Sequence, residues 1–213
     1  MTNSIATTAR IMKNVELGEN AVIGDFVIIG FPPKGRKEGE LKTTIGDNAV
    51  IRSHTVIYAG TEIGDNFQSG HHTNIREENS IGNDVSIGTN TVVEFKTKIA
   101  DNARIHSQAF IPEYCELHEG CWVGPNVVLT NARFPGAPKS KESLRGPTIC
   151  KDAKVGANST ILPGVKIGRN ALVGAGSVVT RDVPDGKVAA GNPAKIVGDV
   201  YKLRYPTGEK VYE

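Results

Sequence analysis

A strip of histidine and amide side chains recurs in the middle of the chain at a spacing of 18 residues: His54, His72, Asn90, Gln108 and Asn126. His71 and His106 lie one and two residues before members of this series. A neutral imidazole accepts a proton near pH 7, and an amide can orient a reactant or stabilise an oxyanion. The strip therefore predicts proton-transfer chemistry, with His72 ranked first as the base, His71 and His106 next, and Gln108 as the orienting residue. A solvated row of polar corner residues is the alternative interpretation.

The spacing follows from a ladder of branched aliphatic residues at every sixth position. From Ile45 to Leu129, and again from Ile149 to Val179, every ladder position except Ser69 is Ile, Val or Leu, although the chain is only 38% hydrophobic. A six-residue period is typical of a parallel β-helix, in which three hexads form one triangular coil. Residues 18 apart then stack in one column, and a weaker ladder from Ile11 onward brings the total to about eight coils.

Two polar segments interrupt the ladder, at residues 30–44 and 130–148. We expect both to be loops inserted into one β-helix domain of residues 1–200, which a short tail of residues 201–213 follows. Loops on a rigid repeat scaffold often carry binding residues. Asn131 and Arg133 of the second loop are therefore expected to contact a substrate, together with Asn90 and Asn126. A surface excursion without a binding role is the alternative.

The composition argues against a nucleic-acid-binding, secreted or membrane-spanning protein. The net charge is +2 and the pI is about 8.4, which gives no electrostatic case for a nucleic-acid partner. The N-terminal residues lack the apolar core of a signal peptide, and no apolar run is long enough to span a membrane. Cys115 and Cys121 occupy inward positions of the repeat, whereas Cys150 is expected to face outward. These cysteines argue against a disulfide framework and favour a reducing cytoplasm.

The most specific motif is at the C-terminal end of the ladder. Residues 173–184 read VGAGSVVTRDVP, and GNPAK follows at residues 191–195. This stretch resembles the end of a hexapeptide-repeat acetyltransferase. The resemblance implies a left-handed parallel β-helix, a homotrimer with active sites between subunits, acetyl-CoA as co-substrate and no metal. It also implies a set of acetyl-CoA contacts: Gly156, Ala157, Gly174, Ala175, Pro193, Ala194 and Lys195, with Arg181 as a further partner for the phosphates.

The middle of the chain is similar to one subgroup of that family. The segments His106-Ser107-Gln108 and Gly124 to Asn131 resemble enzymes that N-acetylate nucleotide-linked amino sugars. The implied reaction is direct attack of the sugar amine on the thioester of acetyl-CoA, in the biosynthesis of surface polysaccharides. Three alternatives stay open: acetylation of a sugar hydroxyl, a zinc-dependent β-helix of the carbonic-anhydrase type, and a scaffold without catalytic activity.

Overall fold

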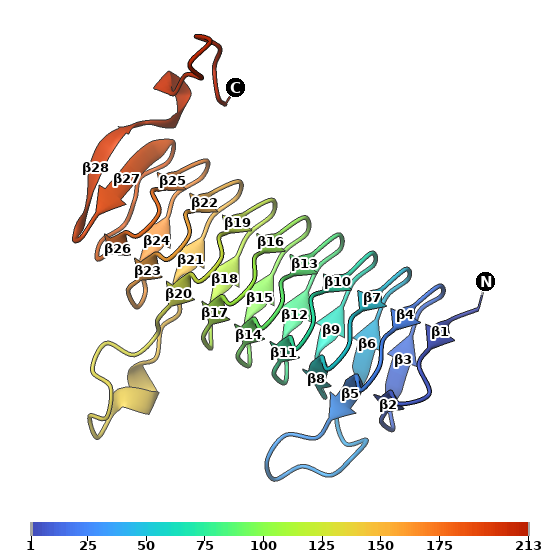
Figure 1. Cartoon of the computed structure of the whole chain (residues 1–213). Helices are drawn as coiled ribbons and strands as arrows, with labels where there is room; N and C mark the ends of the chain where they lie inside the picture. The colour runs from blue at the N-terminus through green and yellow to red at the C-terminus, as the bar shows by residue number, and fades with distance from the viewer. Residues whose placement is uncertain (1, 213) are drawn as a thin grey trace.

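A computed structural model describes residues 2–212 as a left-handed parallel β-helix (Figure 1). Its strands form three long sheets along the axis. Sheet A contains β1 (Ser4–Ile5), β4 (Val22–Ile23), β7 (Val50–Ile51), β10 (Gln68–Ser69), β13 (Ser86–Ile87), β16 (Arg104–Ile105), β19 (Trp122–Val123), β22 (Lys154–Val155), β25 (Leu172–Val173), β27 (Lys187–Gly191) and β28 (Ala194–Asp199).

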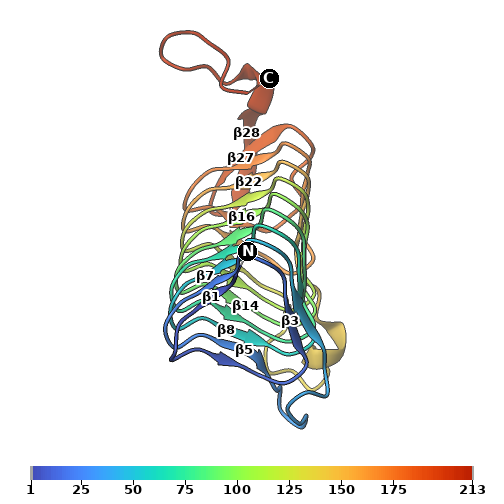
Figure 2. The same cartoon turned by 90° about the vertical axis from the view of Figure 1, so that its right-hand side faces the viewer.

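The other two sheets complete the triangular section that is visible along the axis (Figure 2). Sheet B contains β2 (Arg10–Ile11), β5 (Ile28–Phe31), β8 (Val56–Tyr58), β11 (Asn74–Ile75), β14 (Val92–Val93), β17 (Phe110–Ile111), β20 (Val128–Leu129), β23 (Thr160–Ile161) and β26 (Val178–Val179). Sheet C contains β3 (Val15–Leu17), β6 (Thr43–Ile45), β9 (Glu62–Ile63), β12 (Ser80–Ile81), β15 (Lys98–Ile99), β18 (Glu116–Leu117), β21 (Thr148–Ile149) and β24 (Lys166–Ile167).

The aliphatic ladder forms the core, as predicted. Ile57, Ile75, Val93 and Ile111 are each 0% exposed and stack in register in sheet B. The helix has about ten turns, more than the eight expected, because β1 and β27 add coils beyond the recognisable ladder. Ser69, the exception, is also fully buried, and its Oγ accepts a hydrogen bond from the Arg52 backbone N–H at 3.0 Å.

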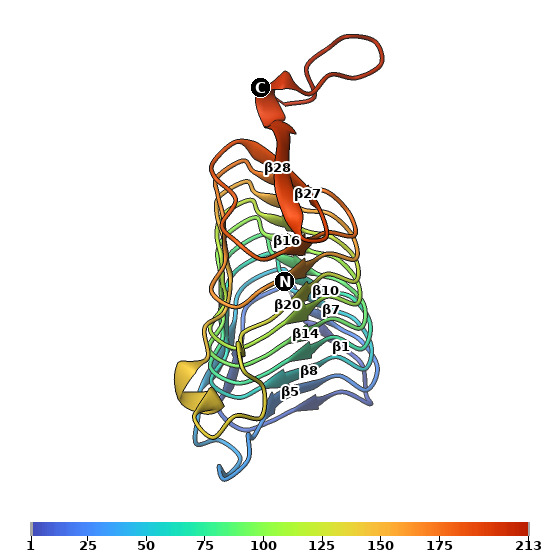
Figure 3. The same cartoon turned by 90° about the vertical axis from the view of Figure 1, so that its left-hand side faces the viewer.

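Both interruptions of the ladder leave the prism at the edge between sheets B and C. Residues 32–42 connect β5 to β6, and residues 130–147, which include the 3-10 helix η1 (Ser140–Ser143), connect β20 to β21. Figures 1 and 3 show the two loops projecting from the same edge. At the C-terminal end β28 pairs antiparallel with β27, and η2 (Val200–Lys202) follows.

The cysteines differ from expectation at one position. Cys115, Cys121 and Cys150 are all free thiols and all buried, so the prediction that Cys150 faces outward was wrong. Cys150 occupies the corner position that is glycine in other coils, such as Gly82, where the next coil covers any side chain. Within residues 2–212, no helix combines the length and the hydropathy needed to cross a membrane.

Candidate active site

The predicted histidine and amide strip lies along the edge between sheets A and B. Its five members all have positive φ, from 53° at His72 to 62° at His54 and Gln108. His72 stacks on His54 with ring centroids 4.6 Å apart, and His54 in turn contacts Phe26 at 5.0 Å. Asn tolerates this left-handed conformation better than most residues, which explains the amides of the column. Histidine is also enriched in this conformation, and all five side chains are exposed.

A polar groove beside this edge contains two of the other candidates. It has a volume of about 340 Å³ and is lined by His71, His106, Arg52 and Arg104, among others, whereas His72 is not among its lining residues. The Ser53 hydroxyl lies 2.8 Å from Nδ1 of His71. The His106 ring packs on Trp122 with centroids 4.5 Å apart. Burial, helped by the positive charge of Arg104, lowers the pKa of His106, so its imidazole is neutral at pH 7.

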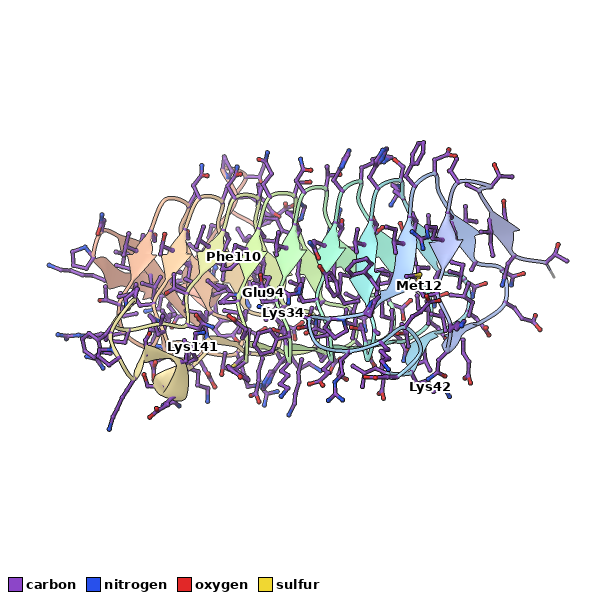
Figure 4. The ribbon with its side chains drawn as sticks, turned by 90° about the horizontal axis from the view of Figure 1, so that it is seen from below. Met12, Lys34, Lys42, Glu94, Phe110 and Lys141 are labelled. Atoms are coloured by element: carbon purple, nitrogen blue, oxygen red, sulfur yellow. The ribbon has the colours of Figure 1, made fainter. Side chains whose placement is uncertain are left out.

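A second cluster lies on the opposite edge, between sheets B and C; it includes the predicted residue Asn131, whereas its charged members were missed by sequence reasoning. Asn131 is 9% exposed, and its Nδ2 donates to Oε2 of Glu113 at 2.6 Å. One coil earlier along the same edge is Glu94, labelled in Figure 4. Arg76 donates to the Glu94 carboxylate at 3.2 Å and forms a bidentate pair with Glu77 at 2.8 and 3.0 Å. We call Glu94, Glu113 and Asn131, with Arg76 and Glu77, the acidic cluster.

The electrostatics of the acidic cluster favour a cationic ligand. Partial burial raises the pKa of Glu94, the positive charge of Arg76 opposes that shift, and the nearby Glu113 and Glu77 add to it. Glu77 and Glu94 share one guanidinium, while Glu113 is bonded to the neutral amide of Asn131, which leaves the cluster short of positive charge. The sequence contains a signal for it, because Arg76 and Glu94, and likewise Glu113 and Asn131, are 18 residues apart.

Arg133 lies away from the acidic cluster, near the base of the 130–147 loop. It lines a hollow of about 380 Å³ together with Arg145 and Arg181, beside Gly164. Three guanidinium groups and one carboxyl group, that of Asp182, line this hollow, and the excess of positive charge suits phosphate groups. The structure thus brings the predicted residues Arg133 and Arg181 together.

The predicted acetyl-CoA contacts divide into two groups. Gly156, Ala157, Gly174 and Ala175 continue the edge between sheets A and B beyond Asn126. A Cβ on neighbouring Gly176 would meet no atom within 4 Å, whereas a Cβ on Gly156 would lie 2.5 Å from the backbone nitrogen of Ala175, so the open backbone is at Gly176. Pro193, Ala194 and Lys195 lie at the β27–β28 turn and on β28. Ala194 and Lys195 line a hollow of about 260 Å³ that also includes Arg181. An extended ligand could follow the edge and end at these cations.

The two candidate edges border the same sheet, whose outer surface is apolar. The outward column of sheet B includes Val56, Val92, Phe110 and Val128, with Phe110 37% and Val128 38% exposed. Figure 4 shows Phe110 on this side of the molecule, near Glu94 in the view. The outward column of sheet C is polar instead, with residues such as Glu62, Ser80, Lys98, Glu116 and Lys166.

No group of three or more His, Cys, Asp or Glu side chains within residues 2–212 is arranged to hold a metal ion. His71 and His106 both line one groove, and no third histidine is among its lining residues.

Parts of the chain are similar to a known protein family and to proteins of known activity. Residues 146–181 match the model of the bacterial transferase hexapeptide family, which describes six repeats. Over 59 residues the chain is 52% identical to a dTDP-3-amino-3,6-dideoxy-alpha-D-galactopyranose 3-N-acetyltransferase from Aneurinibacillus thermoaerophilus. This match covers 28% of this chain and 31% of the relative. It is 36% identical over 97 residues to a galactoside O-acetyltransferase from Lactococcus lactis, covering 41% and 46%. The matches thus span less than half of either curated relative.

Similarity to a solved structure extends over more of the chain. A Bacillus cereus protein described as a candidate acetyltransferase superposes with a TM-score of 0.55 at 26% identity, covering 82% of this chain and 84% of that one. With the hexad ladder and the match in the last coils, this similarity identifies the chain as a hexapeptide-repeat β-helix protein related to acetyltransferases.

Proposed function

We propose that the protein transfers an acetyl group from acetyl-CoA to the amino group of a nucleotide-linked amino sugar. The observation that carries this proposal is the half-buried acidic cluster at the base of an inserted loop. A carboxylate such as Glu113, fixed by Asn131, accepts hydrogen bonds from an amine and holds it in one orientation. A hydroxyl acceptor would gain less from three neighbouring carboxyl groups. The similarity to an amino-sugar N-acetyltransferase supports the same choice.

The reaction needs a neutral amine. Its nitrogen attacks the thioester carbonyl carbon, the carbon–sulfur bond breaks, and CoA leaves as a thiol after taking up a proton. His72, His71 and His106 are the proposed bases for the amine proton, and Gln108 orients the reactants. Acetyl-CoA would lie along Gly156, Ala157, Gly174 and Ala175, with its phosphates near Lys195 and Arg181.

Sheet B separates the proposed base from the proposed amine site within one chain. Three copies that pack sheet B around a common axis would bring the A–B edge of one copy beside the B–C edge of the next. Gln108 and Glu113 belong to the same coil, so they would meet at the same height. The apolar surface of sheet B supports a homotrimer of this kind, with Asn90 and Asn126 of one copy facing Glu113 and Asn131 of its partner.

The test is release of thiol from acetyl-CoA with nucleotide-linked amino sugars, each matched with the hydroxyl sugar of the same nucleotide. We expect turnover with an amino sugar and an acetamido product by mass spectrometry. Glu113→Gln should lower kcat/KM about 10- to 100-fold, the effect of losing a hydrogen bond to a charged group. The matched control is Glu119→Gln, which replaces an exposed glutamate that pairs with Lys151. Transfer to the hydroxyl sugar alone would contradict N-acetylation, and no release with any acceptor would contradict the proposed function.

A further inference from the structure

The groove on sheet A contains a concentration of hydrogen-bond donors that the proposed transfer step does not use. Arg52 and Arg104 line it, and neither guanidinium has a carboxylate within ion-pair distance among residues 2–212. No Asp or Glu lines the groove. Besides the imidazoles of His71 and His106, its polar lining consists of amide and hydroxyl side chains: Gln68, Ser69, Ser86, Thr89 and Ser107. Two unpaired guanidiniums in a groove without acids create a positive potential that attracts anions.

Two glycines contribute backbone to the groove. Gly70 and Gly88 occupy the corner column that holds Arg52 and His106 in the flanking coils. A Cβ on Gly70 or Gly88 would overlap the backbone nitrogen of the next coil, at Thr89 or Ser107. Glycine at these two positions therefore permits the close packing of successive coils, and because it carries no side chain, its backbone lines the groove directly.

Arg52 is held at one end of this groove. Its Nη1 donates to the carbonyl oxygen of Ser69, and its backbone N–H donates to the Ser69 hydroxyl, which is also 3.2 Å from Oγ1 of Thr55. The loss of the core aliphatic at Ser69 thus has a structural use, because the serine anchors Arg52. A guanidinium with one N–H group engaged keeps others free for a ligand.

The dimensions suit an elongated anion. Three coil steps separate the corner positions of Arg52 and His106, which is about 14 Å at the strand spacing. A single phosphate would occupy a small part of that length, whereas a nucleoside diphosphate extends over most of it, and the long arginine side chains can reach inward from both ends. Arginine binds phosphate oxygens bidentately, and hydroxyl donors add to that recognition.

We infer that this groove binds the diphosphate of the nucleotide-linked acceptor, with Arg52 and Arg104 as its phosphate ligands. The inference rests on the proposed function for the identity of the ligand. The groove ends at His106 and Ser107, in the coil that also contains Gln108 and Glu113. A sugar linked to a diphosphate in the groove would therefore reach the height of Glu113 in the partner copy. Acetyl-CoA also carries a diphosphate, but its proposed path lies in the later coils, from Gly156 onward.

Binding of dTDP, UDP and CoA, each measured by isothermal titration calorimetry on the full-length chain, tests this site. The groove variants are Arg52→Gln and Arg104→Gln. The control is Arg169→Gln, which replaces an exposed arginine at the edge between sheets C and A. Melting temperatures establish that all variants are folded. We expect each groove variant to weaken nucleoside diphosphate binding about 10- to 100-fold, to leave CoA binding unchanged, and Arg169→Gln to resemble wild type.

Three results would overturn the inference: no binding of either nucleoside diphosphate to the wild-type protein, unchanged binding in both groove variants, or an equal loss in Arg169→Gln. A selective loss of CoA affinity in the groove variants would instead assign the groove to the co-substrate, and would also overturn it. Because the readout is binding, absence of acetyl transfer would count against the proposed function without altering these outcomes.

Discussion

Glu94 is a carboxyl group whose surroundings disfavour its charge. Its side chain is 21% exposed, and Glu113 and Glu77 lie near it with one compensating guanidinium, so the pKa of Glu94 is raised. The folded state then holds its proton more tightly than the unfolded state does. Stability therefore falls as the pH rises from the ordinary glutamate pKa of about 4.3 through the raised value.

Replacing Glu94 by glutamine, its neutral isostere, should remove the loss of stability that ionisation of this carboxyl group causes. We expect Glu94→Gln to melt at a higher temperature than wild type at pH 7, with the difference shrinking toward pH 4. Thermal melts across this pH range measure it, with Glu62→Gln on the exposed face of sheet C as control. A Glu94→Gln protein that is less stable than wild type at pH 7 would mean that the pair with Arg76 outweighs the unfavourable surroundings.

Residues with a distinctive type were easier to predict than residues with a distinctive environment. The histidine and amide column was visible because histidine is uncommon at such corners, and the structure shows it as one continuous edge. Glu94 and Glu113 are two among 23 acidic residues, and their 18-residue spacing from Arg76 and Asn131 does not by itself show that they are partly buried. Burial of an outward-facing residue depends on the path of the loop that covers it, which the six-residue pattern does not specify.

At the scale of elements, the period of the ladder was sufficient to predict the architecture, the core and the stacking of columns. The number of turns was underestimated because the terminal coils lack a full set of aliphatic residues; Ile5 in β1, for example, is 43% exposed. The prediction for Cys150 failed because alternation describes strands, whereas Cys150 follows a strand and enters a corner.

The corner glycines beside sheet A give a prediction about packing between coils. Gly88→Ala places a methyl group against the backbone nitrogen of Ser107, and we expect it to destabilise the protein by about 1–3 kcal/mol, as overpacking does. Gly198→Ala is the comparison, because the nearest atom to its Cβ would be 3.8 Å away. Denaturant melts of both variants measure the difference. Equal stability of the two variants would show that the coils can separate locally at no cost.

At the scale of the whole molecule, the three faces of the prism differ in character. Sheet C carries charged and polar residues, while the outward column of sheet B is mainly apolar, with Asn74 between Val56 and Val92. We expect Phe110→Glu to dissociate the proposed trimer, which sedimentation or light scattering would measure, and Ser80→Glu on sheet C to leave the assembly intact. A wild-type protein that sediments as a monomer would contradict packing through sheet B.

The separation of the two edges by sheet B explains why the candidate residues do not form one site within a chain. The sequence placed Gln108 and Asn131 in nearby coils, but the relation between them depends on which face packs against a partner. That packing is a property of the outer surface, where the hexad rule allows almost any residue. We therefore propose that one active site needs two copies of the chain.

Mixing two inactive proteins tests whether residues of two copies form one active site. One protein carries Glu113→Gln, and the other carries His72→Ala with Gln108→Ala; each alone should have little activity. In trimers assembled randomly from equal amounts, about a quarter of the interfaces would combine two intact edges, so the mixture should recover about a quarter of wild-type thiol release from acetyl-CoA. A mixture no more active than its two components would contradict a site shared between copies.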